Sequence, residues 1–281
     1  MNARANMSDT DFGAGGAATR QTLYQQEPVL LIFAAMLAAM MLPTFFAYLA
    51  ETRTFNGINV WIKPLKFMSS AAIFLITLAL FMPFLDRSQR ERPAVRNAIW
   101  VISVFLMLEI LYITFRASRA EASHFNRETA LNIALYAWMG VTILIATVLS
   151  GWIGWLILRS RNAIARPDLR YAIGIGLLVG TALGSLTAAY MGTQSDHWVG
   201  GVRTDAGGSF FFGWSRTGGD LRVAHFIGLH AMQGIPLIGW LVSAIAPAFT
   251  RPAVNIAVVL WIVVTVATFA QAVAERALLP L

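Results

Sequence analysis

Apolar residues run through this chain in blocks of about 20, and polar residues gather between the blocks. A helix rises about 1.5 Å per residue, so a block of this length crosses the roughly 30 Å of hydrocarbon in a bilayer. The pattern therefore predicts an all-α, polytopic membrane protein with a bundle of seven transmembrane helices. The predicted spans are Pro28–Ala50, Phe67–Leu85, Val95–Phe115, Ala130–Leu158, Tyr171–Met191, Leu221–Ala246 and Ala253–Glu275.

The composition agrees with this interpretation. Hydrophobic residues make up 57% of the 281 residues and charged residues only 12%, against about 25% charged residues in soluble domains. The chain cannot cover a water-exposed surface with so few charges, so lipid is its expected partner. The net charge of +7 resides mostly in arginines between the apolar blocks, which is a topology signal and argues against nucleic-acid binding. The absence of cysteine excludes disulfides and thiolate metal sites.

Residues 1–27 lack an apolar core and contain Gly13, Gly15 and Gly16, so we interpret them as a disordered tail. Residues 28–281 form one membrane domain, whose first apolar block is too long for a cleaved signal peptide and is expected to remain as a helix. A long connection covers about 192–220 and is rich in glycine, with Phe210 to Phe212 and Trp214 close together. We interpret it as a lid that dips into the membrane interface or folds over a polar mouth.

The fifth span carries a stripe of small residues with a period of four, namely Gly176, Gly180, Gly184, Ala188 and Gly192. Such a stripe lets another helix approach closely. The partner is either a helix of the same bundle, which we favour in a seven-helix chain, or a second copy in a homo-oligomer.

The arginines predict the orientation. Seven spans place the two termini on opposite sides, and the side of the N-terminus has two compact arginine clusters in short connections, at 87–96 and 159–170. On the other side basic residues alternate with acidic ones. Because positive charge in short loops stays in the cytoplasm, we predict a bacterial-type inner (plasma) membrane protein with its N-terminus in the cytoplasm and its C-terminus outside.

The outer side also collects the reactive side chains. All four histidines and both lysines of the chain are predicted to lie there. Glu109 lies seven residues before Arg116, about 10 Å into the membrane, and His230 lies eight residues after Arg222, about 12 Å in. An isolated carboxylate at that depth costs several kcal/mol unless it is paired, protonated or hydrated. We therefore predict His230 as the partner of Glu109, with Arg116 as the other candidate.

The histidines suggest a cofactor. His225 and His230 are five residues apart, about 140° around a helix, so they do not match the spacing of two ligands from one helix to one ion. They also cannot hold one haem from both faces, so each would need a ligand from another helix. His124 is the first candidate for that second ligand.

The sequence therefore predicts one site that opens to the outer face. Its predicted catalytic residues are Glu109, His230, Arg116 and Asp220, the last also as the N-cap of its helix. Its predicted cofactor-binding residues are His225, His230, His124, Trp214, Lys63 and Arg222, and the predicted metal ligands are His225, His230 and Glu109.

This set favours a redox or metal-assisted membrane enzyme that binds haem, a divalent metal or a quinone. The alternatives are a proton-coupled small-molecule transporter that uses Glu109 as its proton site, and an accessory subunit of a membrane complex. Phosphate-loop and nucleophile-elbow motifs are absent. The last span has no lysine, which argues against a retinal protein.

Overall fold

The computed structural model describes residues 23, 27–161 and 166–280. Within them, seven helices are long and apolar enough to cross a membrane, so the predicted all-α seven-helix membrane bundle is confirmed. These are α2 (Pro28–Ala50), α3 (Ile62–Phe81, extended by the 3-10 helix Met82–Phe84), α5 (Pro93–Ser118), α6 (Ala130–Arg159), α7 (Pro167–Thr193), α8 (Leu221–Ile245) and α9 (Thr250–Val273, preceded by the 3-10 helix Pro247–Phe249). The predicted tail lies almost wholly outside the described residues, but Glu27 is described and is fully buried.

Local sequence signals explain where the helices begin. Proline stands in the first turn of α2, α5 and α7, where its missing N–H costs nothing. The predicted bounds of α2 match those of the structure. Helix α3 begins five residues before the predicted Phe67, so Lys63 and Lys66 belong to its first turns.

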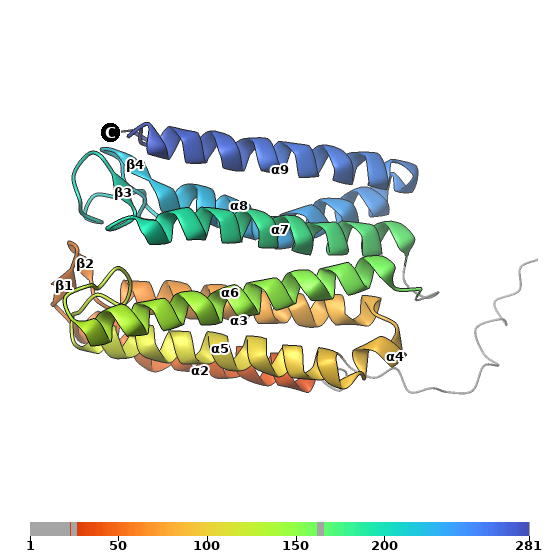
Figure 1. The fold of residues 1–281 in the computed structure, drawn as a ribbon, viewed down its shortest axis with the longest axis horizontal. Coiled ribbons are helices and arrows are strands. Elements are labelled where there is room, and N and C mark those ends of the chain that lie inside the picture. Colours follow the sequence, from red (N-terminus) through yellow and green to blue (C-terminus); the bar gives the residue numbers. More distant parts are fainter. Residues whose placement is uncertain (1–22, 24–26, 162–165, 281) are drawn as a thin grey trace, which may run out of the picture.

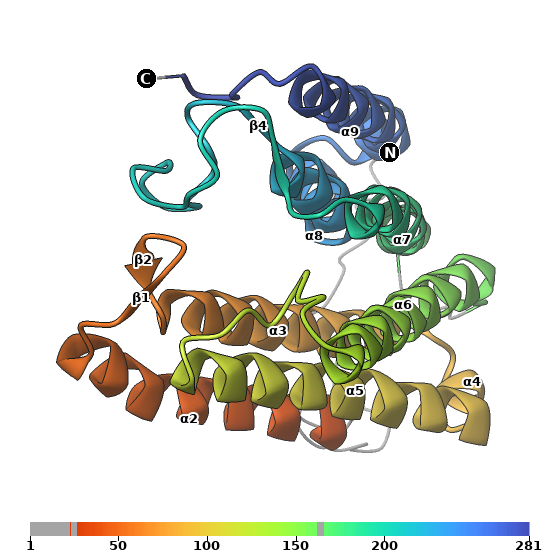
Figure 2. The ribbon, with the colours of Figure 1, turned by 60° about the vertical axis from the view of Figure 1, so that its left-hand side comes forward.

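The helices form two groups, α2, α3, α5 and α6 in one and α7, α8 and α9 in the other (Figure 1 and Figure 2). The closest packing between the groups is that of α6 on α7. The larger apolar core lies mostly within the first group, where Leu30, Met68, Leu75, Ile99 and Ile102 are buried completely, and it extends onto α7 and α8. A smaller core lies among α7, α8 and α9.

The glycine stripe of α7 packs inside the bundle. A Cβ atom on Gly176 would lie 2.6 Å from Pro236, and one on Gly180 would lie 2.9 Å from the backbone nitrogen of Met232. Both neighbours belong to α8. The internal partner favoured from the sequence is therefore correct, and this part of the stripe is not open to a second copy of the chain.

One end of the bundle carries the long connections, and we call it the loop-bearing end (Figure 1). It contains the hairpin β1 (Thr54–Phe55) and β2 (Ile58–Asn59), the α5–α6 connection, and the α7–α8 connection. In the α7–α8 connection, β3 (Trp198–Val199) pairs antiparallel with β4 (Gly219–Asp220) and draws the two ends of the long loop together. The opposite end has short connections, including the one-turn helix α4 (Arg87–Arg90).

Candidate functional site

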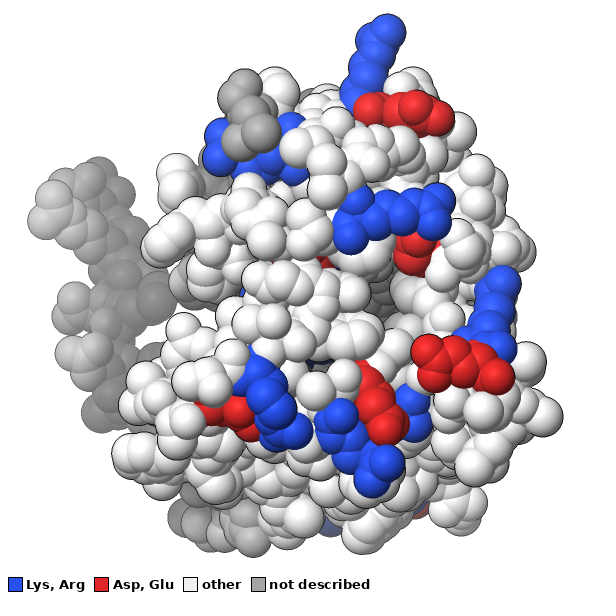
Figure 3. Space-filling model, turned by 90° about the vertical axis from the view of Figure 1, so that its left-hand side faces the viewer, with Lys and Arg blue, Asp and Glu red and all other residues white. Residues whose placement is uncertain are grey.

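The loop-bearing end brings charged and polar side chains from both helix groups together. Figure 3 shows this end with acidic and basic side chains mixed across it, around a hollowed middle. Helix α3 contributes Lys63, α5 contributes Glu109, and α8 contributes Arg222 near its first turn. The remaining members come from loops.

Glu109 and His124 form the centre of the site. Glu109 is 6% exposed, and its Oε1 atom lies 4.0 Å from Nε2 of His124. The other carboxylate oxygen, Oε2, is buried without a hydrogen-bond partner among the described residues. On the far side of the imidazole, Nζ of Lys63 lies 3.2 Å from Nδ1 and Oγ of Ser123 lies 3.1 Å from it.

These contacts fix the imidazole tautomer. Burial lowers the pKa of His124 well below its usual value, and the positive charge of Lys63 lowers it further. His124 is therefore neutral at pH near 7. Because a lysine nitrogen only donates, Nδ1 accepts from Lys63 and the proton of the ring is on Nε2, facing Glu109.

The α5–α6 connection places His124 by an unusual backbone. Ala120 and Phe125, on either side of His124, both have positive φ, at 54° and 57°. Non-glycine residues adopt this region at a cost, and such residues concentrate at functional sites. Arg116 stabilises the turn, since its Nε donates to the carbonyl of Ala122 at 3.0 Å and its guanidinium pairs with Glu121 at 2.9 Å.

The prediction of Glu109's partner was therefore wrong. Within the described part of the chain, the histidine within ion-pair range of Glu109 is His124 and not His230. The ring of His230 instead stacks on Phe226, with 3.9 Å between centroids. Arg116 pairs with Glu121 instead of Glu109, so its contacts are those of a positioning residue.

A second polar group lies in the α7–α8 connection. Nε2 of His197 is 3.6 Å from Oδ1 of Asp205, and Arg222 reaches the same oxygen at 2.8 Å. Burial raises the pKa of Asp205, but the neighbouring His197 and the charge of Arg222 outweigh it, so the net shift is downward. Burial lowers the pKa of His197. Sequence reasoning missed this pair because nothing near Asp205 in the sequence marks it as a partner of His197.

Aromatic rings connect the two polar groups across the helix groups. The ring of Phe125 lies 5.4 Å from Tyr136 and 6.2 Å from His197, and His124 lies 6.2 Å from Tyr136. The hairpin contributes as well, because the carbonyl of Asn56 accepts hydrogen bonds from Asp205 and Thr204 in the long loop. The loop-bearing end is thus one connected site.

His225 and His230 each direct Nδ1 at a backbone carbonyl. Nδ1 of His225 lies 3.1 Å from the carbonyl of Gly184, and Nδ1 of His230 lies 2.8 Å from that of Phe226. This arrangement leaves Nε2 as the lone-pair nitrogen, as in metal-binding histidines. However, no group of three or more His, Cys, Asp or Glu among the described residues is arranged to hold a metal ion. The predicted ligand set of His225, His230 and Glu109 is therefore not brought together.

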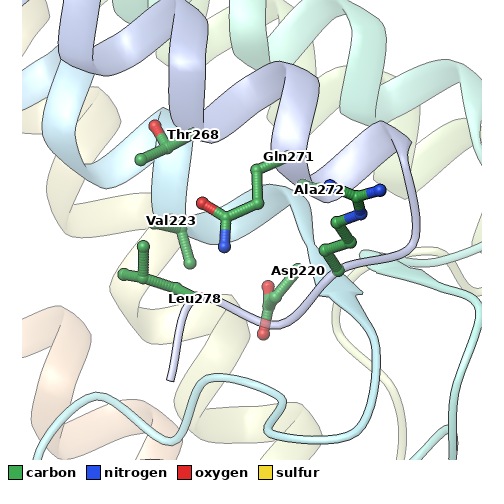
Figure 4. Close-up of a pocket in the computed structure, with 7 residues that line it drawn as sticks. Asp220, Val223, Thr268, Gln271, Ala272 and Leu278 are labelled. Carbon is green, nitrogen blue, oxygen red and sulfur yellow. The ribbon is translucent and has the colours of Figure 1, made fainter. Parts of the chain in front are cut away.

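Asp220 caps α8, as predicted. Its carboxylate accepts from the backbone N–H groups of Arg222 and Ser215 and pairs with the Arg222 guanidinium at 2.7 Å. Figure 4 shows Asp220 beside Gln271 and Leu278, in a depression with no room for a water-sized ligand. These contacts give Asp220 a structural role at the loop-bearing end.

Residues 209–214, which we call the aromatic lid, contact α3 and α8 at the loop-bearing end. Lys66 donates to the carbonyl of Phe212 at 3.0 Å, and Arg222 donates to that of Gly213 at 2.9 Å. Phe212 stacks on Trp214 with 4.2 Å between ring centroids, and both rings contact Phe226 of α8.

Comparisons with family models, with curated proteins and with solved structures found no match for this chain.

Proposed function

We propose that the protein is a membrane enzyme of the redox class that binds a small molecule at the loop-bearing end and exchanges protons with it. The observation that carries this proposal is the buried pair of Glu109 and His124, which face each other at 4.0 Å. This separation is too long for a hydrogen bond, and Oε2 of Glu109 has no partner in the described structure. Intramembrane ionisable groups with such unmet contacts are functional by default.

The pair has complementary chemistry. Glu109 offers carboxylate oxygens that can accept a proton, while the neutral His124 offers an N–H on Nε2. A hydroxyl or carbonyl group bound between them would be held by both, which is the arrangement of general acid–base catalysis. Lys63 fixes the imidazole orientation from the other side. Redox reactions of hydroxyl and carbonyl compounds transfer protons together with electrons, and this pair supports the proton part.

The electron carrier would be haem or a quinone. His225 and His230 support a cofactor because each has Nε2 available, with Nδ1 held by a backbone carbonyl. Each histidine would supply one ligand through Nε2, and the other ligands would come from the cofactor itself or from solvent.

The first experiment uses the purified protein in lipid nanodiscs. Absorption spectra, metal analysis and mass spectrometry of an organic extract are expected to find a redox-active group in stoichiometric amount. Reduction of that group in weak buffer with a pH indicator should show proton uptake in the wild type. Glu109→Gln should slow the uptake by about 100-fold.

Glu51→Gln is the matched control, because Glu51 directly follows α2 at the loop-bearing end and its carboxylate is already paired with Arg53. It should leave proton uptake unchanged. A wild-type protein with no redox-active group and no quinone binding, or unchanged uptake in Glu109→Gln, would refute the proposal.

A proton-coupled transporter is the second candidate, and the division into two helix groups favours it. The groups meet chiefly at α6 and α7, and contacts such as Lys66 to Phe212 bridge them at the loop-bearing end. Against it, α2 and α8 continue through Pro43 and Pro236, whereas many transporters bind substrate at broken helices. Loss of flux in Glu109→Gln liposomes with substrate binding retained would favour a transporter.

We also propose a bacterial-type plasma membrane with the loop-bearing end outside, supported by the arginines at the opposite end. The chain has no cysteine, so single cysteines report topology cleanly. An impermeant maleimide should label Val202→Cys, in the long loop, in intact cells. It should label Ser88→Cys, in α4, only after the membrane is permeabilised.

A further inference from the structure

Helices α3 and α8 turn polar faces toward the aromatic lid without packing closely on each other. They belong to different helix groups (Figure 2), and they are not among the closely packed helix pairs. Both begin at the loop-bearing end and run toward the opposite end. Polar side chains that lack a covering helix commonly line ligand pathways in membrane proteins.

The face of α8 is defined by its contacts. Arg222 and Phe226 touch the lid, and His230 and Gln233 follow at spacings of four and three residues. All four are partly exposed, while Oε1 of Gln233 is buried and has no partner within the described residues. One turn deeper the face becomes apolar at Leu237, which is 54% exposed.

The face of α3 has the same gradient. Lys66 reaches the lid, and Ser70 follows one turn deeper. Ile73 and Leu80 continue the face and are 58% and 52% exposed. Each helix thus presents polar groups near the loop-bearing end and apolar groups deeper in the membrane. This order suits an amphiphilic ligand with a polar head and an apolar tail.

Aromatic rings complete the polar end. Phe212 stacks on Trp214 and Phe226 stacks on His230, and the two pairs meet edge to face, with neighbouring centroids between 3.9 and 5.7 Å apart. Two further lid rings point outward, since Phe210 and Phe211 are 106% and 74% exposed. Exposed aromatics at this level suit the membrane interface, where they would hold the lid against lipid.

We propose that these faces of α3 and α8 bind a lipid-soluble quinone, which enters sideways from the bilayer between the two helices at the aromatic lid. The inference rests on the proposed redox function and names its substrate class. A quinone has a planar ring that stacks on aromatics, oxygens that accept from Lys66 and the Gln233 amide, and an apolar tail that suits Leu237, Ile73 and Leu80. In the quinol form, its hydroxyl would donate to Nε2 of His230.

Lys63 and Lys66 connect this binding site to the proton-exchange pair. They lie three residues apart in the first turns of α3, so they are neighbours on the helix surface. Lys63 contacts His124 and Lys66 contacts the lid. A quinone head next to this turn lies close to the residues proposed to exchange its protons.

The test measures binding of a decyl-tailed benzoquinone to the protein in nanodiscs by quenching of tryptophan fluorescence. We expect saturable quenching whose amplitude falls in Trp214→Phe, which keeps a stacking ring. Trp100→Phe is the control. Trp100 is exposed on α5, near the end of that helix that lies away from the loop-bearing end. Quenching that does not saturate, or that falls equally in both variants, would overturn the inference.

Two further variants locate the head group. Lys66→Met and Gln233→Leu should each weaken binding by about tenfold, as loss of one hydrogen bond to a ligand predicts. A benzoquinone without a tail should bind far more weakly; equal affinity would overturn entry from the lipid. If proton uptake depends on Glu109 but quinone does not bind, this inference fails and the proposed function stands.

Discussion

The Nε2 atom of His124 lies 4.0 Å from Oε1 of Glu109, although the two residues are fifteen positions apart and belong to a loop and a helix. The contact depends on the α5–α6 connection turning back over the end of α5, which Arg116 stabilises through Ala122 and Glu121. The gap is wider than a hydrogen bond, and a water molecule or a ligand hydroxyl would bridge it. The loop therefore places the N–H of His124 opposite the carboxylate of Glu109 on α5, with room for a third group between them.

Replacing the imidazole tests that relationship. His124→Gln keeps a hydrogen-bonding side chain but removes the group that titrates. We expect the rate of proton uptake on reduction to fall about 100-fold, as for loss of a general acid–base residue. Stopped-flow absorbance of a pH indicator measures the rate. A rate equal to that of the wild type would exclude His124 from proton transfer.

The lid contacts make a second prediction. Lys66 donates to the carbonyl of Phe212 and thereby ties the aromatic lid to α3. Lys66→Met removes this bond, so amides of residues 209–214 should exchange hydrogen faster, because local opening becomes easier. Hydrogen exchange read by mass spectrometry in nanodiscs measures it. Lys66→Arg keeps a cationic donor and should restore slow exchange; equal exchange in all three proteins would show that the bond does not restrain the lid.

The sequence predicts the bundle well because length and hydropathy determine which segments cross a membrane. It also predicts that the histidines gather at one end. It does not predict their partners, since depth along a helix says nothing about direction around it. His230 has the depth expected for a partner of Glu109, yet its ring lies on Phe226.

The loops were the harder part to predict. Ala120 and Phe125 adopt positive φ, although neither residue type signals such a turn. The pairing of His197 with Asp205 depends on a glycine-rich loop whose path is set by β3 and β4 and by Asn56. Long-range contacts of this kind have no local pattern in the sequence.

Close packing of α7 on α8 gives a third prediction. A Cβ atom at position 180 would lie 2.9 Å from the backbone nitrogen of Met232 and 3.0 Å from the carbonyl of Leu229. Backbone atoms cannot move aside easily, so Gly180→Ala should destabilise the protein by about 1–3 kcal/mol. Thermal unfolding in detergent measures the change.

Gly140→Ala is the matched control, because a Cβ atom there meets nothing within 4 Å. Alanine favours the helix over glycine by about 0.5–1 kcal/mol, so this variant should be at least as stable as the wild type. If both variants unfold at the same temperature, the glycine at position 180 is not needed for helix packing.

Glu27 provides a pH-dependent prediction at the opposite end of the bundle. Its carboxylate is fully buried, 3.5 Å from Arg96 and 3.8 Å from Arg90. Burial raises its pKa from 4.5 to about 7, although both arginines act to lower it. Because the folded pKa lies above the unfolded one, the stabilising contribution is complete below pH 4.5 and is lost as pH rises through about 7.

The wild type should therefore unfold more easily at about pH 8 than at about pH 5, with this group accounting for at most about 3 kcal/mol. Glu27→Gln cannot ionise, so its unfolding temperature should depend less on pH over that range. Glu91→Gln is the control, because Glu91 lies at the same end but is exposed and paired with Arg87. A Glu27→Gln protein with the pH dependence of the wild type would show that the buried carboxylate does not govern stability there, and that another group at the arginine-rich end must titrate instead.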